Sequence, residues 1–260
     1  MIKSQFLNIT RPLETNQTWN WAPLEKESYE KVKDRVPYGP GDITYKFNNY
    51  GFRCDDFSSW EKHPYRILYA GASVTEGIGL PLNDIWPKLL HKKICKTFNM
   101  DIPFWTVASC GTSLDHMVRY IYNLKDLLRP QIIISYLPDI LRREREHEDR
   151  WGVWTLQNKE EKYTSILMDE RIIKYQLEKN FVMLNLILED IDSYFLFSHP
   201  EYPDSTQYNL SIFIQKNILL DHFDVGRDGV HHGPNSHLAF SEKMFNNFWP
   251  IIKQKLTLPK

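Results

Sequence analysis

The sequence predicts an α/β fold, a three-layer α/β/α sandwich in which helices cover both faces of a parallel sheet. Short apolar runs alternate with helical patterns over most of the 260 residues, and this alternation is typical of βαβ units. The first three runs are almost continuously apolar, as parallel strands covered on both faces must be. A glycine or a proline follows each of the three within two residues and opens a loop.

The first half of the sheet is predicted from three runs. Strands are expected at residues 65–70 (YRILYA), 104–109 (FWTVAS) and 131–137 (QIIISYL). Between them, helices are expected from about residue 83 to 98 and from 114 to 128. One face of the first helix carries the apolar residues Ile85, Leu89, Leu90 and Ile94.

The second half continues the alternation after a charged run at residues 142–150 (RREREHEDR), whose arginines are expected on a solvated helix face. A long helix is expected from about residue 163 to 189, and a fourth strand at residues 193–198 (SYFLFS). Residues 207–223 fit either a helix or a strand. A last helix is expected at residues 237–255.

Residues 1–60 are expected to form an irregular arm that packs on the core, with residues 61–260 as the main domain. The prolines Pro12, Pro23, Pro37 and Pro40 interrupt this arm, and it has few periodic apolar stretches. Its first residues (MIKSQFLNIT) lack the apolar stretch of a signal peptide, and no run approaches the roughly 18 apolar residues of a membrane span.

The net charge and the cysteine spacing limit the kinds of partner and cofactor to be expected. The chain carries 32 basic and 33 acidic side chains, a net charge of −1, so neither nucleic acid nor a membrane is expected as a partner. Cys54, Cys95 and Cys110 form no CxxC pair and no zinc spacing. Reduced thiols fit this pattern, so we expect a cytoplasmic protein without a metal or other cofactor.

Three candidate site features follow the predicted strands or lie near the C-terminus. Ser73 follows the first strand, Gly111 follows the second, and Asp228 and His231 lie three residues apart in a glycine-rich loop. The carboxyl ends of parallel strands meet at one edge of a sheet, where ligands bind. A serine there needs a base to take its proton, and an Asp–His pair supplies an oriented imidazole. Taken alone, each feature also fits an ordinary turn.

Two further features of these loops have competing interpretations. Thr112 or Ser113 would cap the helix that follows Gly111, and Asp139, after the third strand, would cap a helix or support the site.

The C-terminal loop region is also rich in potential metal ligands, although their spacing matches no fixed metal motif. These are Asp221, His222, Asp224, Asp228, His231, His232 and His237.

Together, the segments resemble the SGNH (GDSL-like) hydrolase superfamily. Gly71-Ala72-Ser73 is similar to the family's first block, with Ala72 where Asp is commoner. Gly111 resembles the second block, and Asp228-Gly229-Val230-His231 is similar to the final DxxH block. The resemblance covers about residues 48–250 and implies a flavodoxin-like sheet. It also implies Ser73 as nucleophile, His231 as base, Asp228 as its partner, and the N–H groups of Ser73 and Gly111 as oxyanion donors.

The third block departs from the family pattern. An asparagine that donates to the oxyanion is usual there, whereas this sequence has Tyr136-Leu137-Pro138-Asp139. Proline has no N–H group and no side-chain donor. Arg142 or Arg143 would have to supply the missing donor, unless the activity is weak or the substrate differs.

The resemblance implies a serine esterase that removes an acyl group, with acetyl on a carbohydrate as the favoured substrate, through an acyl-enzyme. Aromatic residues make up 14% of the chain, in keeping with a small-molecule or glycan ester as substrate. Three alternatives remain: a glycan-binding descendant without activity, an O-acyltransferase, and a metal-dependent hydrolase that uses the His/Asp-rich loop.

Overall fold

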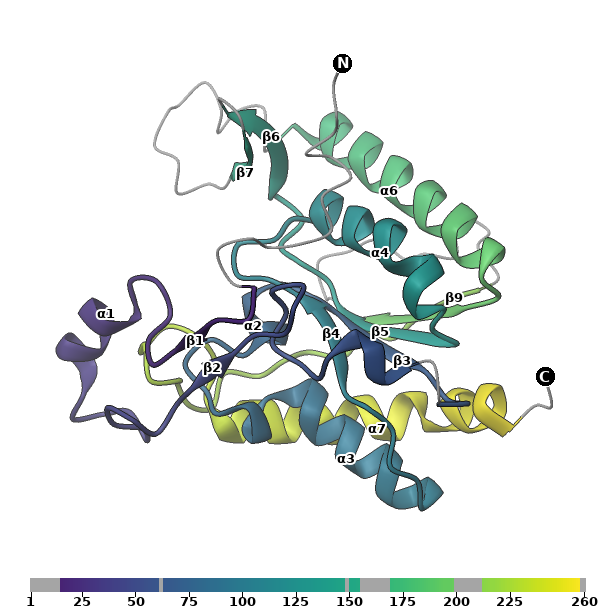
Figure 1. Cartoon of the computed structure of the whole chain (residues 1–260). Coiled ribbons are helices and arrows are strands. Elements are labelled where there is room, and N and C mark those ends of the chain that lie inside the picture. The colour runs from purple at the N-terminus through teal and green to yellow at the C-terminus, as the bar shows by residue number, and fades with distance from the viewer. Residues whose placement is uncertain (1–14, 61–62, 148–149, 155–168, 199–211, 258–260) are drawn as a thin grey trace.

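The central sheet of the computed structural model has five parallel strands in the order β4-β3-β5-β8-β9. The model describes residues 15–60, 63–147, 150–154, 169–198 and 212–257 (Figure 1). The strands are β3 (Ile67–Gly71), β4 (Trp105–Ala108), β5 (Ile132–Tyr136), β8 (Tyr194–Ser198) and β9 (Phe213–Gln215). This order is the flavodoxin-like one, so the predicted α/β sandwich is confirmed.

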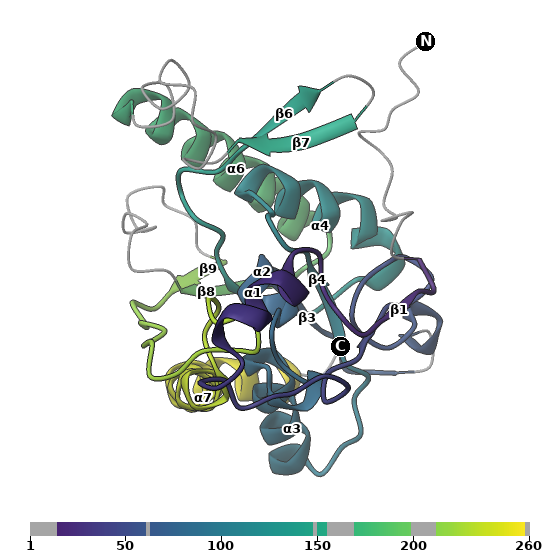
Figure 2. The same cartoon turned by 90° about the vertical axis from the view of Figure 1, so that its left-hand side faces the viewer.

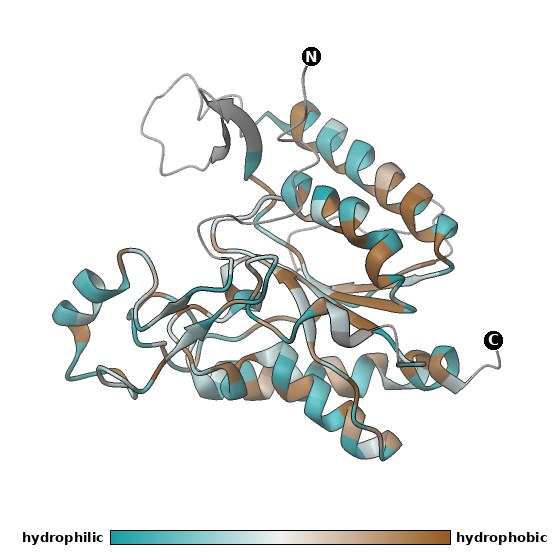
Figure 3. Ribbon diagram, viewed as in Figure 1, coloured by the Kyte–Doolittle hydropathy of each residue, from teal (hydrophilic) through white to brown (hydrophobic). Residues whose placement is uncertain are grey.

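Two pairs of helices cover the two faces of the sheet (Figure 1). On one face lie α4 (Leu114–Leu128) and α6 (Glu170–Asp190), and on the other lie α3 (Trp86–Phe98) and α7 (Pro234–Thr257). Each face encloses its own cluster of buried apolar side chains. Figure 3 shows the apolar colouring concentrated in the strands between the two helical layers. Both faces are therefore buried, which explains the unbroken apolar runs of the strands.

The strand register aligns the ends from which the informative loops leave. Gly71, the last residue of β3, lies beside Ala108 of β4 and Tyr136 of β5. Tyr136 in turn lies beside Ser198, the last residue of β8. The loops after these four strands therefore start at one edge of the sheet, as a parallel sheet requires.

The described part of the N-terminal arm contains short regular elements. They are β1 (Thr18–Trp19), α1 (Glu25–Val32), β2 (Tyr45–Lys46) and the 3₁₀ turn η2 (Phe57–Trp60). β1 pairs with β2 in antiparallel fashion, and Phe52 and Phe57 join the core on the α4 face. In both ribbon views α1 lies on the side of the sheet at which α2 (Ser73–Glu76) follows β3 (Figure 1, Figure 2).

Most predicted boundaries agree with the structure to within a few residues. The expected helix at 83–98 begins instead as a 3₁₀ turn, η3 (Leu82–Asp84), and α3 starts at Trp86. The ambiguous segment 207–223 contains the strand β9, while residues 199–211 lie outside the described part. The last helix starts at Pro234 rather than 237, because the Asp224 carboxylate accepts the first-turn N–H groups of Asn235 and Ser236.

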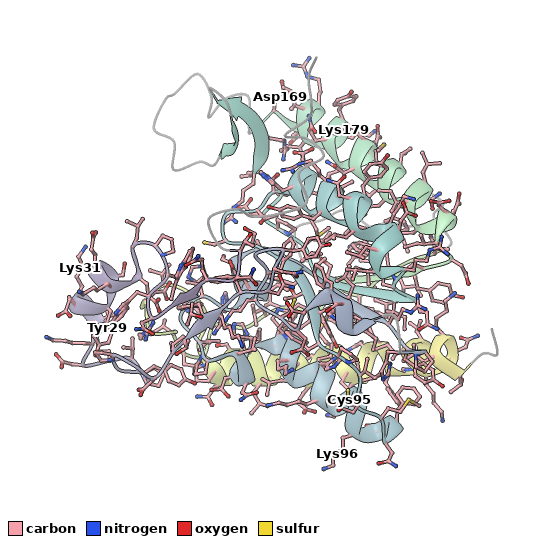
Figure 4. The ribbon with its side chains drawn as sticks, in the orientation of Figure 1. Tyr29, Lys31, Cys95, Lys96, Asp169 and Lys179 are labelled. Carbon is pink, nitrogen blue, oxygen red and sulfur yellow. The ribbon has the colours of Figure 1, made fainter. Side chains whose placement is uncertain are left out.

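The long helix α6 is also shorter than expected within the described residues. It begins at Glu170, where the carboxylate of Asp169 accepts the N–H of Arg171 at 2.9 Å. The predicted start at residue 163 falls in the segment 155–168, outside the described residues. Lys179 of α6 donates to Asp115 of α4 at 2.8 Å; both Asp169 and Lys179 are labelled in Figure 4.

The charged run after β5 was predicted wrongly as a helix face. It forms an antiparallel hairpin, β6 (Arg143–His147) with β7 (Arg150–Trp154), because the run is followed by Trp and Val residues that favour strands. The helix-capping interpretation of Asp139 is wrong as well. Its carboxylate accepts the N–H of Leu141 at 2.8 Å in the turn that leads into the hairpin.

Within the described residues, no helix is both long enough and apolar enough to cross a membrane.

Two buried histidines link the stability of this fold to pH. His91 of α3 lies against the carbonyl of Ile102 (2.7 Å), and His237 of α7 accepts the N–H of Trp86 through Nδ1 (2.8 Å). Burial lowers the pKa of His91 to about 4 and that of His237 to about 3. Both rings are therefore neutral in the folded protein at pH values where the unfolded chain binds protons.

We predict that the free energy of unfolding falls by about 2–4 kcal/mol between pH 6.5 and pH 5. The sign follows from the lowered pKa values, because in this range acid protonates the two rings only in the unfolded chain. Urea denaturation at several pH values measures the effect. The variant His91→Asn should be less stable at pH 7 yet lose less on acidification. A wild-type stability that is flat from pH 6.5 to 5 would contradict the prediction.

Candidate active site

Ser73 is the first residue of α2 and lies two residues beyond Gly71, the end of β3. The chain turns sharply at Gly71, where a Cβ atom would lie 2.2 Å from Oγ1 of Thr75 and 2.8 Å from the carbonyl oxygen of Tyr136. Only glycine fits that space. The turn places the Ser73 side chain, which is 5% exposed, at the edge of the sheet where the strands end.

The structure brings Ser73, His231 and Asp228 together in one hydrogen-bonded chain. Ser73 Oγ lies 2.9 Å from His231 Nε2, and His231 Nδ1 lies 2.5 Å from Asp228 Oδ2. A carboxylate only accepts hydrogen bonds, so Nδ1 carries the proton and Nε2 is left to accept from the serine hydroxyl. This is the arrangement in which an imidazole removes a proton from serine.

Asp228 is held ionised by its surroundings. Burial by itself would raise the pKa of Asp228, but the hydrogen bond and charge of His231 lower it, as do the N–H groups of Val230 and His231. These two N–H groups donate to Oδ1 at 3.1 and 3.0 Å. The net pKa of Asp228 lies below its ordinary value, so the carboxylate is charged at neutral pH.

Gly111 lies in a tight turn after β4. The turn is closed by the N–H of Thr112, which donates to the carbonyl of Ser109 at 3.2 Å, and Gly111 has φ +75°, as the third residue of a type II turn requires. The N–H of Ser109 donates to the carbonyl of Gly71 at 3.4 Å, so this turn lies next to the start of α2. Of the two predicted capping residues, Ser113 caps α4 by accepting the N–H of His116.

Glu76 connects the two loops and was not identified from the sequence. Its carboxylate, on a side chain that is 2% exposed, accepts the N–H of Cys110 at 2.5 Å. Cys110 precedes Gly111, so Glu76 holds the turn that contains Gly111. A carboxylate one helical turn after Ser73 is the only signal in the sequence, and a solvated residue would look the same.

The loop after β5 does not offer the donor that the family pattern places there. Pro138 is buried and has no N–H group. Arg143, one of the two proposed substitutes, directs its guanidinium to the carbonyl oxygens of Ile140 and Arg142 in the same loop. Arg142 lies half-buried in the turn before β6. The assignment of the backbone N–H groups of Ser73 and Gly111 as oxyanion donors stays a prediction.

The potential metal ligands near the C-terminus do not gather around one point. Within the described part of the chain, no group of three or more His, Cys, Asp or Glu side chains is placed to hold a metal ion. Asp221 pairs with Lys243, Asp224 caps α7, and His237 accepts the N–H of Trp86. The rings of His222 and His232 lie against each other, 4.7 Å between centroids. This geometry gives no support to the metal-dependent alternative.

The loop that carries Asp228 docks on the loop that follows Ser73. The N–H of Arg227 donates to the carbonyl of Gly79 at 2.8 Å. A Cβ atom on Gly79 would lie 3.0 Å from Arg227 N and 3.1 Å from Asp228 Oδ1, and Gly79 has φ +80°. Glycine therefore permits both the backbone conformation and the close approach of the two loops.

Comparison with known proteins gives a match at the level of structure. No protein-family model matches the chain, and no curated protein matches its sequence. A family 3 carbohydrate esterase from Clostridium thermocellum superposes with a TM-score of 0.50 at 11% identity, covering 73% of this chain and 98% of that one. At such identity the likeness concerns the fold.

Two other similar structures have lower TM-scores. The psychrotrophic esterase EstA from Pseudoalteromonas sp. gives a TM-score of 0.48 at 14% identity, with 72% of this chain and 98% of that one covered. A GDSL-like lipase from Bacteroides thetaiotaomicron gives 0.38 at 11% identity, with 73% and 88% covered. The α/β fold expected from the sequence is thus confirmed by the match at a TM-score of 0.50, and this chain shares the fold of that carbohydrate esterase.

Proposed function

We propose that this protein is a serine esterase that hydrolyses an acyl ester through an acyl-enzyme. The observation that carries the proposal is the hydrogen-bonded chain from Ser73 Oγ through His231 to Asp228, with distances of 2.9 and 2.5 Å. A serine hydroxyl is a weak nucleophile, and a base within hydrogen-bond distance is what activates it.

The reaction has two steps. In the first, His231 Nε2 takes the Ser73 proton while Oγ attacks the acyl carbon, and the alcohol leaves with the proton that His231 returns. In the second, His231 takes a proton from water, the resulting hydroxide attacks the acyl-enzyme, and Ser73 leaves with that proton. Asp228 holds the ring and stabilises its charged form in both steps.

The oxyanion of each tetrahedral intermediate is assigned to the N–H groups of Ser73 and Gly111. The Ser73 N–H belongs to the first turn of α2, where N–H groups have no acceptor within the helix. The loss of one oxyanion donor typically costs about 10²–10³ in rate. With Pro138 in place of the usual asparagine, we therefore expect a slow esterase.

We assign acetyl as the acyl group and a carbohydrate as its carrier. Support comes from the carbohydrate esterase that shares the fold at a TM-score of 0.50, and from an aromatic content of 14%. A comparison of acetylated sugars with long-chain aryl esters tests this assignment, which predicts faster turnover of the acetylated sugars. An O-acyltransferase would pass the acyl group to a sugar hydroxyl, and added acceptors would then yield an acylated product.

Pro138 favours a second candidate, a protein of the same fold that binds glycan esters without turnover. This candidate retains the Ser73–His231 contact but places no group to complete the oxyanion site. Binding of an acetylated sugar without product release, measured by calorimetry and product analysis, would support it.

We predict that Ser73→Ala abolishes both labelling by a fluorophosphonate probe and hydrolysis of an aryl acetate, a loss of at least about 10³-fold. The physical reason is that Oγ is the atom that forms the acyl bond. Ser241→Ala is the matched control, since this serine is buried in α7, where its hydroxyl donates to the carbonyl of Leu238. The esterase proposal fails if the wild-type protein shows neither labelling nor turnover, or if Ser73→Ala retains both.

A second prediction concerns the acid of the triad. Asp228→Asn should lower kcat by about 10⁴-fold, because an amide in place of the carboxylate favours the wrong tautomer of His231. Steady-state hydrolysis of the aryl acetate measures the change. Asp224→Asn is the control, because this nearby carboxylate caps α7 and should affect stability while kcat stays near the wild-type value. Equal effects of the two substitutions on kcat would count against a role for Asp228.

A further inference from the structure

A closed ring of hydrogen bonds joins the N-terminal arm to both loops of the candidate active site. The Glu25 carboxylate of α1 accepts from Arg227 Nε at 2.9 Å and from the hydroxyl of Tyr45 at 3.0 Å. The same hydroxyl accepts the N–H of Gly79 at 2.8 Å, and the carbonyl of Gly79 accepts the N–H of Arg227 at 2.8 Å. The ring therefore connects four residues from three distant segments.

The ion pair in this ring is withdrawn from water. The side chains of Glu25 and Arg227 are both 0% exposed. A second contact, Arg227 Nη2 to Glu25 Oε2 at 3.1 Å, makes the pair bidentate. The guanidinium also donates to the carbonyl of Asn20 at 2.6 Å and lies 4.1 Å from the ring centroid of Trp21. These contacts together fix the direction of the Arg227 side chain.

Other residues of the N-terminal arm pack around the Glu25–Arg227 pair and the loop that carries Asp228. Trp21 packs on Tyr29 of α1, with 5.3 Å between ring centroids, and Figure 4 labels Tyr29 on the α1 side of the molecule. Val32, at the end of α1, lies against Gly229 of the candidate site loop, where an added Cβ atom would come within 2.7 Å. The arm therefore contacts the loop on both sides of Asp228.

The loop after Ser73 is held from the same direction by a second buried arginine. Arg53 of the arm donates through Nη1 to the carbonyl of Gly77 at 2.7 Å and through Nη2 to that of Leu80 at 2.8 Å. Its guanidinium also lies 4.4 Å from the ring centroid of Tyr45, the residue that binds Gly79. Both loops thus take their position from groups in residues 15–60.

We propose that Glu25 is a positioning residue for Asp228 and His231: by fixing Arg227, it sets the place of the loop that delivers the imidazole to Ser73. This inference rests on the proposed esterase function. It makes the N-terminal arm a working part of the active site rather than a cover for the core.

Stability alone does not account for a buried pair of this kind. Well-packed apolar side chains can replace a buried ion pair with little or no loss of stability, because the charges lose their hydration. What such replacements lose is directional bonding. Here the directional bonds end on the residue next to Asp228, and a displacement of about 1 Å in a catalytic group can lower a rate by about 10²-fold.

The test compares Glu25→Gln with Glu30→Gln, a matched control on the exposed side of the same helix, where Glu30 binds Lys33. We expect Glu25→Gln to lower kcat for the aryl acetate about 10–100-fold, with KM nearly unchanged. The His231 Nδ1 proton that bonds to Asp228, observed by proton NMR, should shift or broaden in Glu25→Gln. Glu30→Gln should match the wild type in both measurements.

A folded Glu25→Gln protein with wild-type kcat and an unshifted His231 resonance would overturn the proposal. If this variant does not fold, Tyr45→Phe decides, because it removes only the hydroxyl that joins Glu25 to Gly79. We then expect a smaller drop in kcat, about 10-fold or less, with the same NMR change; wild-type values of both would overturn the proposal.

The NMR measurement separates this inference from the esterase proposal. If the wild type shows the His231 resonance and Glu25→Gln shifts it, but no Ser73 labelling occurs in either, then the esterase proposal fails and the positioning role of Glu25 stands.

Discussion

The active-site arrangement depends on one close backbone contact, between Gly79 in the loop after Ser73 and the pair Gly226-Arg227 in the loop before His231. A Cβ atom on Gly226 would lie 3.0 Å from the carbonyl oxygen of Gly79, so both loops meet through glycine. The contact determines how far the imidazole stands from the hydroxyl. The sheet brings Ser73 to the edge where its strands end. The sheet does not by itself set the distance from Ser73 to His231, because His231 lies in a loop before α7, which begins at Pro234.

Much of the fold was predictable because local patterns of apolar and polar residues specify its strands and helices. The mostly apolar run at 131–137 favours a strand buried on both faces, and it corresponds to β5. The helix expected at 114–128 agrees with α4, since one amphipathic stripe and one capping serine define it. The contact between Ser73 and the Asp228–His231 pair was predictable because the serine follows a strand and the Asp–His spacing in a glycine-rich loop allows the two side chains to meet.

The remaining features depend on pairings that a single sequence does not display. Glu25 and Arg227 lie 202 residues apart and carry no local signal, since isolated charged residues are most often solvated. Glu76 likewise looks like a surface residue of a short helix. The hairpin of β6 and β7 was missed because a dense run of charges suggests a solvated helix face, whereas its strand character comes from the partner residues 150–154.

The spacing of Ser73 and His231 along the chain has a consequence for biosynthesis. Ser73 and His231 are 158 residues apart, and the chain between them contributes β4, β5 and β8 to the sheet. A ribosome-bound chain that has emerged as far as the third sheet strand therefore displays the serine without its base. The Ser73 hydroxyl can therefore meet the His231 ring only after the C-terminal loop has been synthesised and has docked on the sheet edge.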